Sequence, residues 1–344
     1  MDDLNLRAGL AARACPDDCL DRERAETTIL LPVYNDWAAL GKLLGVLDEV
    51  LSEHDIRVHV LVVDDGSTQA LPSAPLVGAG RAIDQVEVLH LRRNLGHQRA
   101  IAVGLAYLEA ERPRSELVVV MDSDGEDDPR DVPRLIDRCG QSGRHAMIFA
   151  ERTKRSESLV FRLCYHLYRL AHRALTGRGV RVGNFSVIPR RRLSSLVATS
   201  ELWNHYAAAA FTSKQPFDTI PTHRARRLDG RSKMNFVGLV IHGLSAISVY
   251  SDTIGVRLLL ATLLMMGADV ALLLVTLAIR LSTNLAIPGW TTTVFGVLLI
   301  ILLQATMFLV VFSFMILAGR NSASFLPTRD YVHFVGSKEE VYRR

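Results

Sequence analysis

The fold is decided by two stretches, Val58-His-Val-Leu-Val-Val-Asp-Asp-Gly-Ser67 and Leu117-Val-Val-Val-Met-Asp-Ser-Asp124. Each begins with an unbroken apolar run, which is typical of a strand buried on both faces of a parallel sheet. Each ends in carboxylates, which should therefore lie at the carboxyl edge of the sheet, where open α/β sheets bind their ligands. Because crowded carboxylates repel one another, the pattern predicts a diphosphate site that is assisted by a hard cation, Mg2+ or Mn2+.

Strand-like and helix-like runs alternate from Thr27 to about Pro189, as a layered α/β domain requires. The apolar runs predict strands over 28–33, 58–63, 86–91, 117–121 and 146–150. Helical apolar spacing predicts helices over 37–51, 98–111 and 130–138. We therefore expect one catalytic domain over 27–234. A flexible tail is expected over 1–26, which is polar and lacks the apolar run of a cleavable signal.

The composition suits a soluble core joined to membrane spans. The chain has 344 residues, of which 49% are hydrophobic and 7% aromatic, and its formal net charge is +4. This mild charge argues against a general nucleic-acid-binding protein. The four cysteines lack the paired spacing of a zinc site and are too few to staple a domain of this size. The sequence therefore predicts free thiols in a reducing compartment at Cys15, Cys19, Cys139 and Cys164.

Two apolar segments, Leu258 to Ile279 and about Thr291 to Ala318, reach the length of about 20 residues that crosses a bilayer. The alternative is a pair of buried core helices. Lys and Arg crowd before the first segment and after the second, whereas the connecting loop offers only Arg280. The positive-inside rule then predicts a two-pass protein of the inner or plasma membrane, with both termini and the catalytic domain in the cytoplasm.

The parts around these spans also have predicted roles. Apolar spacing over 235–255 predicts a juxtamembrane amphipathic helix that lies in the membrane interface. Two transmembrane helices are expected within 256–319, followed by a cytoplasmic tail over 320–344. In the first span, Asp269 should face a neighbouring helix or be protonated. Asp269 and Gln304 are polar residues of the kind that mediate contacts between membrane helices, so the formation of a homo-oligomer stays open.

A further helix, predicted over 158–175, carries a basic face. This face is formed by Arg162, His166, Arg169 and Arg173. It is either an ordinary solvated face or a cationic surface that meets lipid head groups or an anionic acceptor.

Polar residues also follow the first predicted strand, in Pro32-Val-Tyr-Asn-Asp36. A turn here can bind a base or ribose, and the neighbouring Asp64-Asp-Gly66 can accept hydrogen bonds from the nucleobase and ribose hydroxyls. A plain Asp-Gly turn is the alternative. After the third strand, Arg92-Arg-Asn-Leu-Gly-His-Gln-Arg99 supplies cations and a helix N-terminus, both of which suit phosphate.

The central acidic group is Asp122-Ser-Asp-Gly-Glu-Asp-Asp-Pro129. Alternate residues of an extended strand point the same way, so Asp122 and Asp124 can share one hard cation, and Glu126 can add a ligand. The alternative is an acidic loop that caps the helix after Pro129.

Six motifs in this order resemble the family 2 inverting glycosyltransferases. They are Pro32-Val-Tyr-Asn35, Val63-Asp-Asp-Gly-Ser67, Asn94-Leu-Gly96, Asp122-Ser-Asp124, Gly183-Asn-Phe185 and Gly230-Arg-Ser-Lys233. The resemblance is strongest to the polyprenyl-phosphate branch, which includes dolichyl-phosphate mannose synthase and undecaprenyl-phosphate glucosyltransferases. It implies an α/β fold, a Rossmann-like glycosyltransferase-A domain with a mixed, mostly parallel sheet, followed by an interfacial helix and two transmembrane helices.

The resemblance also implies roles for particular residues. The nucleotide-sugar donor would be held by Pro32, Tyr34, Asp36, Asp65 and Ser232. The metal, Mg2+ or Mn2+, would be held by Asp122, Asp124 and Glu126, the last in a place where many relatives carry Gln. The residues expected to act in catalysis, by orienting the acceptor phosphate and the diphosphate, are Arg152, Arg162 and Lys233, together with Asp124.

Asn184 departs from the family pattern. Some relatives have an aspartate there that is proposed as a general base, and Asn is no useful proton acceptor. A phosphate-monoester acceptor is already anionic near neutral pH and needs no base. A hydroxyl acceptor would need one, and Glu201 and Glu151 are the nearest in sequence.

The sequence thus predicts a membrane-anchored inverting glycosyltransferase of cell envelope glycan biosynthesis. It would transfer a sugar from a nucleoside-diphosphate sugar to a polyprenyl phosphate at the cytoplasmic face, in contact with membrane lipids and without nucleic acid. One alternative is a saccharide or a lipid hydroxyl as acceptor. Another is a membrane scaffold that binds nucleotide sugars without turnover. The sugar and the nucleobase do not follow from the sequence.

Overall fold

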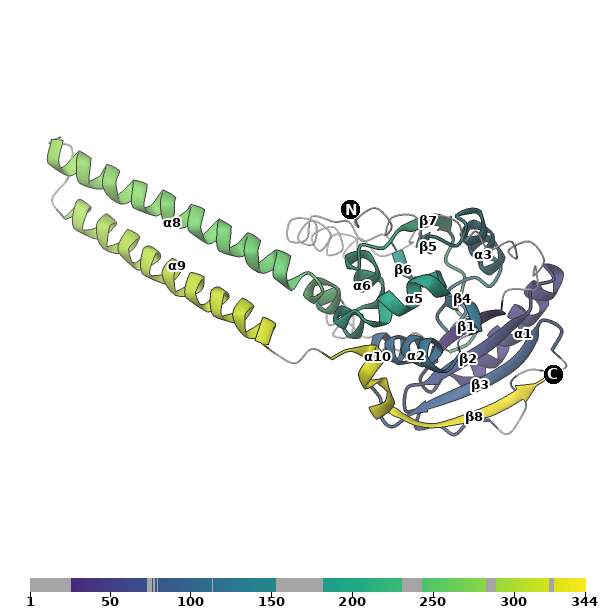
Figure 1. Cartoon of the computed structure of the whole chain (residues 1–344). Helices are drawn as coiled ribbons and strands as arrows, with labels where there is room; N and C mark the ends of the chain where they lie inside the picture. Colours follow the sequence, from purple (N-terminus) through teal and green to yellow (C-terminus); the bar gives the residue numbers. More distant parts are fainter. Residues whose placement is uncertain are drawn as a thin grey trace, which may run out of the picture.

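The structure is a computed structural model that describes residues 26–72, 76, 78, 80–112, 114–152, 182–230, 243–282, 289–321 and 325–344. A sheet domain and two long helices that project from it make up the described chain (Figure 1). The strands are β1 (Glu26–Val33), β2 (Val58–Asp64), β3 (Ile83–Leu91), β4 (Ser115–Val120), β5 (Met147–Arg152), β6 (Val182–Pro189), β7 (Phe217–Thr222) and β8 (Val335–Arg343). The helices of the sheet domain are α1 (Trp37–Glu53), α2 (His97–Glu111), α3 (Asp131–Gln141), α5 (Arg190–Val197), η1 (Ser200–Trp203), α6 (Tyr206–Thr212), α10 (Pro327–Asp330) and η2 (Tyr331–His333).

The strands form one sheet in the order β7-β5-β6-β4-β1-β2-β3-β8. β1 pairs in parallel with β2 and β4, β2 with β3, and β5 with β7. The antiparallel pairs are β3 with β8, β4 with β6, and β5 with β6. This mixed, mostly parallel sheet confirms the predicted fold class. The predicted strands and helices between residues 28 and 150 are all present, with ends that differ by at most three residues.

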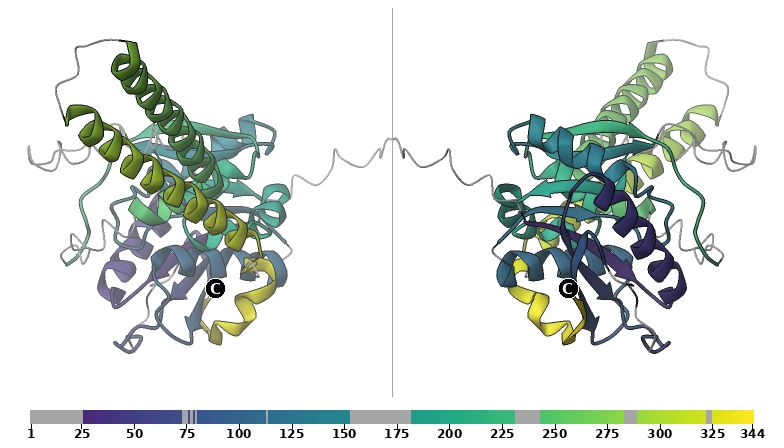
Figure 2. Two further views of the ribbon diagram at one scale, coloured as in Figure 1. Left: turned by 90° about the vertical axis from the view of Figure 1, so that its left-hand side faces the viewer. Right: turned by 90° about the vertical axis from the view of Figure 1, so that its right-hand side faces the viewer.

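Helices cover both faces of the sheet (Figure 2). α1 and α3 pack on one face, and α2, α5 and α6 pack on the other. Successive side chains of β1 serve the two layers in turn, since Ile29 and Leu31 join the α1 layer and Leu30 joins the α2 layer. A strand buried in this way needs apolar residues at every position, which explains the unbroken runs in the sequence.

The topology brings the polar motifs to one edge of the sheet. β1, β2 and β4 are parallel neighbours, so their carboxyl ends lie together. β6 runs antiparallel to β4, and its first residue, Val182, therefore lies at the same edge. β5 and β7 run antiparallel to β6, so their last residues, Arg152 and Thr222, reach this edge as well.

The last strand corrects one prediction. The sequence predicts a tail over 320–344, but β8 joins the sheet beside β3. The Tyr342 hydroxyl accepts a hydrogen bond from the backbone N–H of Gly80 at 2.9 Å, and the N–H of Arg344 donates to the carbonyl of Asp84 at 2.9 Å. Most side chains of β8 are exposed. Backbone pairing therefore holds this edge strand, and it has no apolar pattern that the sequence could reveal.

The two projecting helices are α8 (Ser251–Ser282) and α9 (Trp290–Asn321). Both are long and apolar enough to cross a membrane. Only 11% and 6% of their most apolar stretches are buried inside the protein, which argues against core helices of a soluble domain. α8 and α9 pack against each other as an antiparallel pair (Figure 1).

Asp269 lies on the inner face of this pair. Asp269 and Thr276 are the two buried residues of α8, and their spacing of seven places them on one helical face. Since α8 packs on α9, this face is the one toward α9. The position agrees with the prediction that Asp269 faces a neighbouring helix. Of the predicted juxtamembrane helix, residues 235–242 lie outside the described residues.

Removal of β8 should destabilise the domain. Deletion of residues 335–344 would expose the backbone groups of β3 that now pair with β8. We expect a lower melting temperature and more aggregation in detergent, because an uncovered strand edge pairs with other chains. Differential scanning fluorimetry and size-exclusion chromatography would measure both effects, with Lys338→Gln on exposed β8 as the control. An unchanged melting temperature in the deletion variant would contradict this expectation.

Cys139 should be chemically inert in the folded protein. Of the four cysteines, Cys139 lies within the described residues, where its thiol is free and fully buried. Burial raises the pKa of the Cys139 thiol to about 11, whereas the charge of Arg144 acts to lower it. The stability that this thiol contributes is therefore complete below pH 9.0 and is lost as the pH rises through about 11. In a Cys15→Ser, Cys19→Ser, Cys164→Ser variant, a thiol reagent at pH 8 should label Cys139 only after unfolding. Rapid labelling of the native protein would rule this out.

Candidate active site

The ends of β1 and β2 are tied together by Asn35. Its backbone adopts φ +52°, a left-handed conformation that Asn tolerates better than most residues. The Asn35 side-chain oxygen accepts hydrogen bonds from the backbone N–H groups of Thr68 and Gln69, both at 2.9 Å. The Asn35 N–H in turn donates to the Ser67 hydroxyl at 2.9 Å. These bonds fix the turn that presents Tyr34, whose side chain is exposed, at the edge of the sheet.

Asp65 organises the start of α2. Its two carboxylate oxygens accept hydrogen bonds from the N–H groups of Leu95 (2.6 Å) and Gly96 (2.9 Å). Burial raises the pKa of Asp65, although these two bonds act to lower it. Asp65 is 3% exposed and holds the loop from which His97 begins the helix. Its predicted contact with the donor nucleotide stays a prediction.

The acidic loop after β4 is shaped by its own residues. The buried Asp127 accepts a hydrogen bond from the N–H of Asp122 at 3.0 Å and so shapes the loop. Asp124 accepts from the N–H of Glu126 at 2.9 Å. Gly125 lies between them with φ +80°, and a Cβ there would clash with the Leu228 side chain. The loop can therefore lie close against residues 223–229, which follow β7.

Residues 223–229 carry the cations that face this acidic loop. The N–H of Ala225 donates to the Glu126 carbonyl at 2.9 Å, and the N–H of Leu228 donates to the Asp124 carbonyl at 3.0 Å. Arg224 forms an ion pair with Glu126. These contacts join two segments that are about a hundred residues apart in the sequence.

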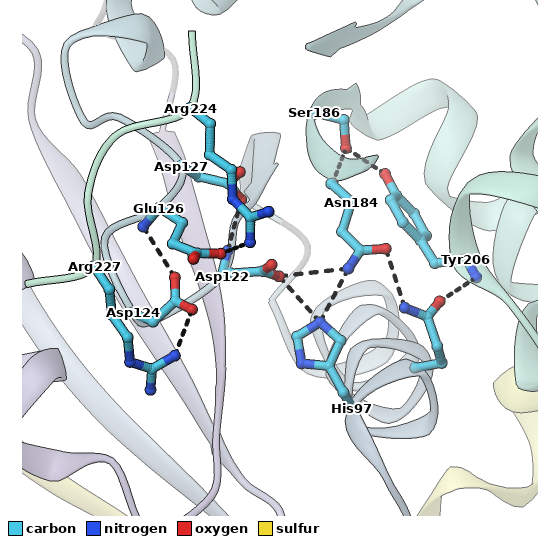
Figure 3. Close-up of polar contacts among 11 residues, drawn as sticks. His97, Asp122, Asp124, Glu126, Asp127, Asn184, Ser186, Tyr206, Arg224 and Arg227 are labelled. Atoms are coloured by element: carbon cyan, nitrogen blue, oxygen red, sulfur yellow. Dashed lines mark hydrogen bonds and ion pairs between the residues drawn. The ribbon is translucent and has the colours of Figure 1, made fainter. Parts of the chain in front are cut away.

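Arg227 bridges the ends of β1 and β4. One guanidinium nitrogen lies 2.8 Å from the Asp124 carboxylate (Figure 3). Another pairs with Asp36. All three side chains are less than one-fifth exposed. Burial raises the pKa of Asp124 and the charge of Asp122 raises it further, while Arg227 and Arg224 act to lower it. Arg227 therefore offsets the repulsion between the carboxylates that meet here.

On the other side of the loop, Asp122 faces α2 and β6. The His97 Nε2 lies 3.0 Å from the Asp122 Oδ1, and the Asn184 Nδ2 lies 3.4 Å from the same oxygen (Figure 3). Burial acts to lower the pKa of His97, but the charge of Asp122, its hydrogen bond, and the charges of Asp127 and Asp65 raise the pKa above its ordinary value. The Asp122 carboxylate therefore favours the protonated form of His97.

The carboxylates suit a hard divalent cation by their chemistry, since Mg2+ and Mn2+ prefer oxygen ligands. In this structure each is paired with a cation of the chain, namely Asp124 with Arg227, Glu126 with Arg224, and Asp122 with His97. Within the residues that the structure describes, no three His, Cys, Asp or Glu side chains converge as a metal-binding group. A metal ion at Asp124 and Glu126 would therefore have to displace the two arginines.

The predicted site residues are only partly brought together. The structure joins Asp36, Asp122, Asp124 and Glu126 through the contacts above, with Tyr34 nearby on the same turn. Pro32 is buried in β1, and Arg152 ends β5 at the same edge. The remaining predicted residues, Arg162, Ser232 and Lys233, lie outside the described residues. Glu151 accepts a hydrogen bond from Thr219, and Glu201 accepts one from Ser200.

Residues 28–194 match the family model described as Glycosyl transferase family 2. The chain contains a family 2 glycosyltransferase domain. An undecaprenyl-phosphate 4-deoxy-4-formamido-L-arabinose transferase from Pseudomonas aeruginosa is 30% identical over 150 residues, which are 44% of this chain and 42% of that protein. The chain therefore spans about two-fifths of that relative in the match. The enzyme of the same name from Erwinia tasmaniensis is 27% identical over 276 residues, 77% of this chain and 80% of that protein.

Among solved structures, the chain is similar to glucosyl-3-phosphoglycerate synthase from Mycobacterium tuberculosis in complex with Mn2+, UDP-glucose and phosphoglyceric acid. The identity is 17% and the TM-score is 0.45, over 67% of this chain and 80% of that chain.

Reasoning from the sequence missed four residues that contact the acidic loop or hold its partners: His97, Gln98, Arg224 and Arg227. Arg224 and Arg227 are visible in the sequence as part of a basic cluster before the first span, where they suggest membrane topology rather than a site. Their pairing with Asp124 and Glu126 depends on the tertiary structure. His97 and Gln98 belong to a helix N-terminus that suggests phosphate binding, but no local pattern tells which way each side chain points.

Arg227 should compete with a metal ion for Asp36 and Asp124. Replacing Arg227 by Gln removes the internal cation and leaves two carboxylates unpaired, so the family 2 domain should bind Mn2+ about tenfold more tightly in the absence of nucleotide. Electron paramagnetic resonance of free Mn2+ would measure the affinity. Arg226→Gln is the matched control, because Arg226 is exposed. Equal or weaker Mn2+ binding by the Arg227 variant would refute the competition.

Proposed function

We propose that the protein is a two-pass membrane glycosyltransferase that transfers a sugar from a nucleoside-diphosphate sugar to a polyprenyl phosphate at the cytoplasmic face. One observation carries this proposal. The acidic edge of the family 2 domain and two membrane-length apolar helices belong to one chain that leaves the sheet after β7 and returns to it as β8. The names of the relatives, undecaprenyl-phosphate sugar transferases, support the same acceptor.

In the proposed reaction, the donor nucleotide binds at Pro32, Tyr34, Asp36, Asp65 and Ser232. Asp122, Asp124 and Glu126 would hold Mg2+ or Mn2+, which neutralises charge on the departing diphosphate. Arg152, Arg162 and Lys233 orient the phosphate of the acceptor and the diphosphate. An oxygen of the lipid phosphate forms a bond to the anomeric carbon on the face opposite the diphosphate. The bond from that carbon to the diphosphate oxygen breaks, and the nucleoside diphosphate leaves with the electron pair.

A phosphate acceptor suits the groups around Asn184. Asn184 directs its amide nitrogen toward Asp122, and His97 is held beside the same carboxylate. The Asn184 amide is no useful proton acceptor, and the His97 Nε2 is already directed at a carboxylate. A phosphate monoester brings its own negative charge, so its attack needs no base.

The topology of the sheet favours an even number of membrane crossings. β8 pairs with β3, so the chain after α9 must be on the same side of the membrane as the sheet domain. Two crossings satisfy this requirement. The basic residues on both flanks of the helical pair then favour the cytoplasm for the sheet domain and both termini.

The proposal predicts a lipid-linked product. Purified protein in detergent, incubated with labelled nucleotide sugars, Mn2+ and undecaprenyl phosphate, should yield a product that partitions into chloroform. Asp124→Asn should reduce its formation at least about 100-fold, because a proposed metal ligand is lost. Asp137→Asn, on the exposed face of α3, is the matched control.

Two results would oppose the proposal. Transfer to diacylglycerol or a saccharide, with none to the phosphate, would favour the hydroxyl acceptor. No product from any common donor, with nucleotide-sugar binding intact, would favour the scaffold. Mass spectrometry of the lipid fraction identifies the sugar in the same experiment.

A further inference from the structure

A chain of hydrogen bonds leads from α6 to the acidic loop. The backbone N–H of Tyr206 donates to the Gln98 Oε1 at 2.7 Å, and the Gln98 Nε2 donates to the Asn184 Oδ1 at 3.1 Å. The Asn184 Nδ2 then lies 3.4 Å from the Asp122 Oδ1 and 3.0 Å from the His97 Nε2, which itself lies 3.0 Å from the same Asp122 oxygen. Gln98 is only 9% exposed, so water is not a ready substitute for either of its partners. Asp122 lies at the end of this chain.

The donor and acceptor roles along this series of hydrogen bonds are fixed by its first bond, in which the backbone N–H of Tyr206 is the donor. A backbone N–H can only donate, so the end of Gln98 that faces Tyr206 must be the carbonyl oxygen. Gln98 then has only its NH2 group to offer to Asn184, which must receive it with Oδ1. Asn184 is left with its own NH2 group toward Asp122. The orientation of both amides therefore follows from the backbone of α6.

Asn184 is also held through its backbone. The Ser186 hydroxyl donates to the Asn184 carbonyl at 2.9 Å, and the Tyr206 hydroxyl lies 2.6 Å from the Ser186 hydroxyl (Figure 3). Tyr206 is fully buried. Since Tyr206 thus anchors both the backbone and the side chain of Asn184, the amide cannot turn without breaking buried hydrogen bonds.

We propose that Gln98 is a positioning residue for the transfer reaction: it fixes the Asn184 amide so that an N–H, and not a carbonyl oxygen, faces Asp122. Gln98 lies outside every motif that carries the family resemblance. The proposal rests on the proposed function, since Asp122 is there a ligand of the metal ion. Its physical content is an energetic coupling between Gln98 and Asp122, which do not touch but are linked by Asn184.

Gln98→Glu tests the direction of the chain, because it keeps the shape and replaces the NH2 group by an oxygen. A pH of 8.5 favours the ionised form of the introduced carboxylate, which can only accept, so Asn184 must turn its NH2 group toward position 98. Its carbonyl oxygen would then face the Asp122 carboxylate, and both are acceptors. The neighbouring His97 Nε2 is already directed at the same Asp122 oxygen, so it can satisfy a turned Asn184 only by giving up that contact. We expect the melting temperature to fall by about 4 °C. The Mn2+ dissociation constant should rise about tenfold, as for other lost partners of metal ligands.

Asp122→Asn supplies the decisive second variant. The amide introduced at position 122 can donate to a turned Asn184, so Gln98→Glu should lower the melting temperature much less in the Asp122→Asn background than in the wild type. When Asn184→Ala is also present, Gln98→Glu should lower the melting temperature equally with and without Asp122→Asn. Gln141→Glu, on an exposed part of α3, controls for the added charge. Differential scanning fluorimetry measures all of these losses.

Gln98→Met keeps the proposal testable where Gln98→Glu does not fold. Methionine keeps the length and makes no strong hydrogen bond, so Asn184 is released without being reversed. Mn2+ binding should weaken in this variant, and unchanged Mn2+ binding would overturn the proposal. Equal losses of melting temperature in the wild-type and Asp122→Asn backgrounds would overturn it too, as would a coupling that persists in Asn184→Ala.

These measurements need no substrate. If the coupling is absent while the wild-type protein makes a lipid-linked sugar, the role of Gln98 fails and the proposed function stands. If the coupling is present while no product forms from any donor, the proposed function fails and the positioning of Asp122 by Gln98 stands.

Discussion

The rest of the site depends on the repulsion among carboxylates that a parallel sheet gathers at one edge. Asp36 follows β1, whereas Asp122 and Asp124 follow β4, and the parallel pairing of these two strands makes their carboxyl ends neighbours. Like charges at such distances raise one another's pKa or require a cation. Arg227 and His97 meet this requirement from distant parts of the sequence. The charge of the site therefore determines where residues 223–229 and the first turn of α2 must lie.

The first turn of α2 also links the site to the part of the chain that returns from the helical pair. Arg99 lies over the ring of Trp203, with 5.2 Å from its Cζ to the ring centroid. The same ring contacts Phe325 and Phe334, at centroid distances of 3.8 and 5.1 Å. These aromatic residues follow α9, so one turn of helix reaches both the acidic loop and the exit from the proposed membrane spans. Residues that follow α9 therefore pack within the sheet domain, beside the first turn of α2.

How far the sequence could predict this arrangement depends on the kind of interaction. The buried strands β2 and β4 were predictable because burial on both faces requires an unbroken apolar run. The approach of Asp36 to Asp124 followed from the rule that parallel strands end at one edge. β8 could not be predicted, because an exposed edge strand is held by backbone bonds that leave no apolar period. The pairing of Arg227 with two carboxylates was hidden for a related reason: its partners are 103 and 191 residues away in sequence.

The same electrostatics explain why an asparagine is tolerated at position 184. An aspartate there would place a carboxylate about 3.4 Å from the Asp122 oxygen that Asn184 now faces. Two carboxylates that close do not both ionise readily, so a base gained at position 184 would weaken Asp122 as a ligand for a cation. An amide whose NH2 group is directed at Asp122 has the opposite effect, since it stabilises the charged form. A site built in this way favours an acceptor that is already ionised over one that must first lose a proton.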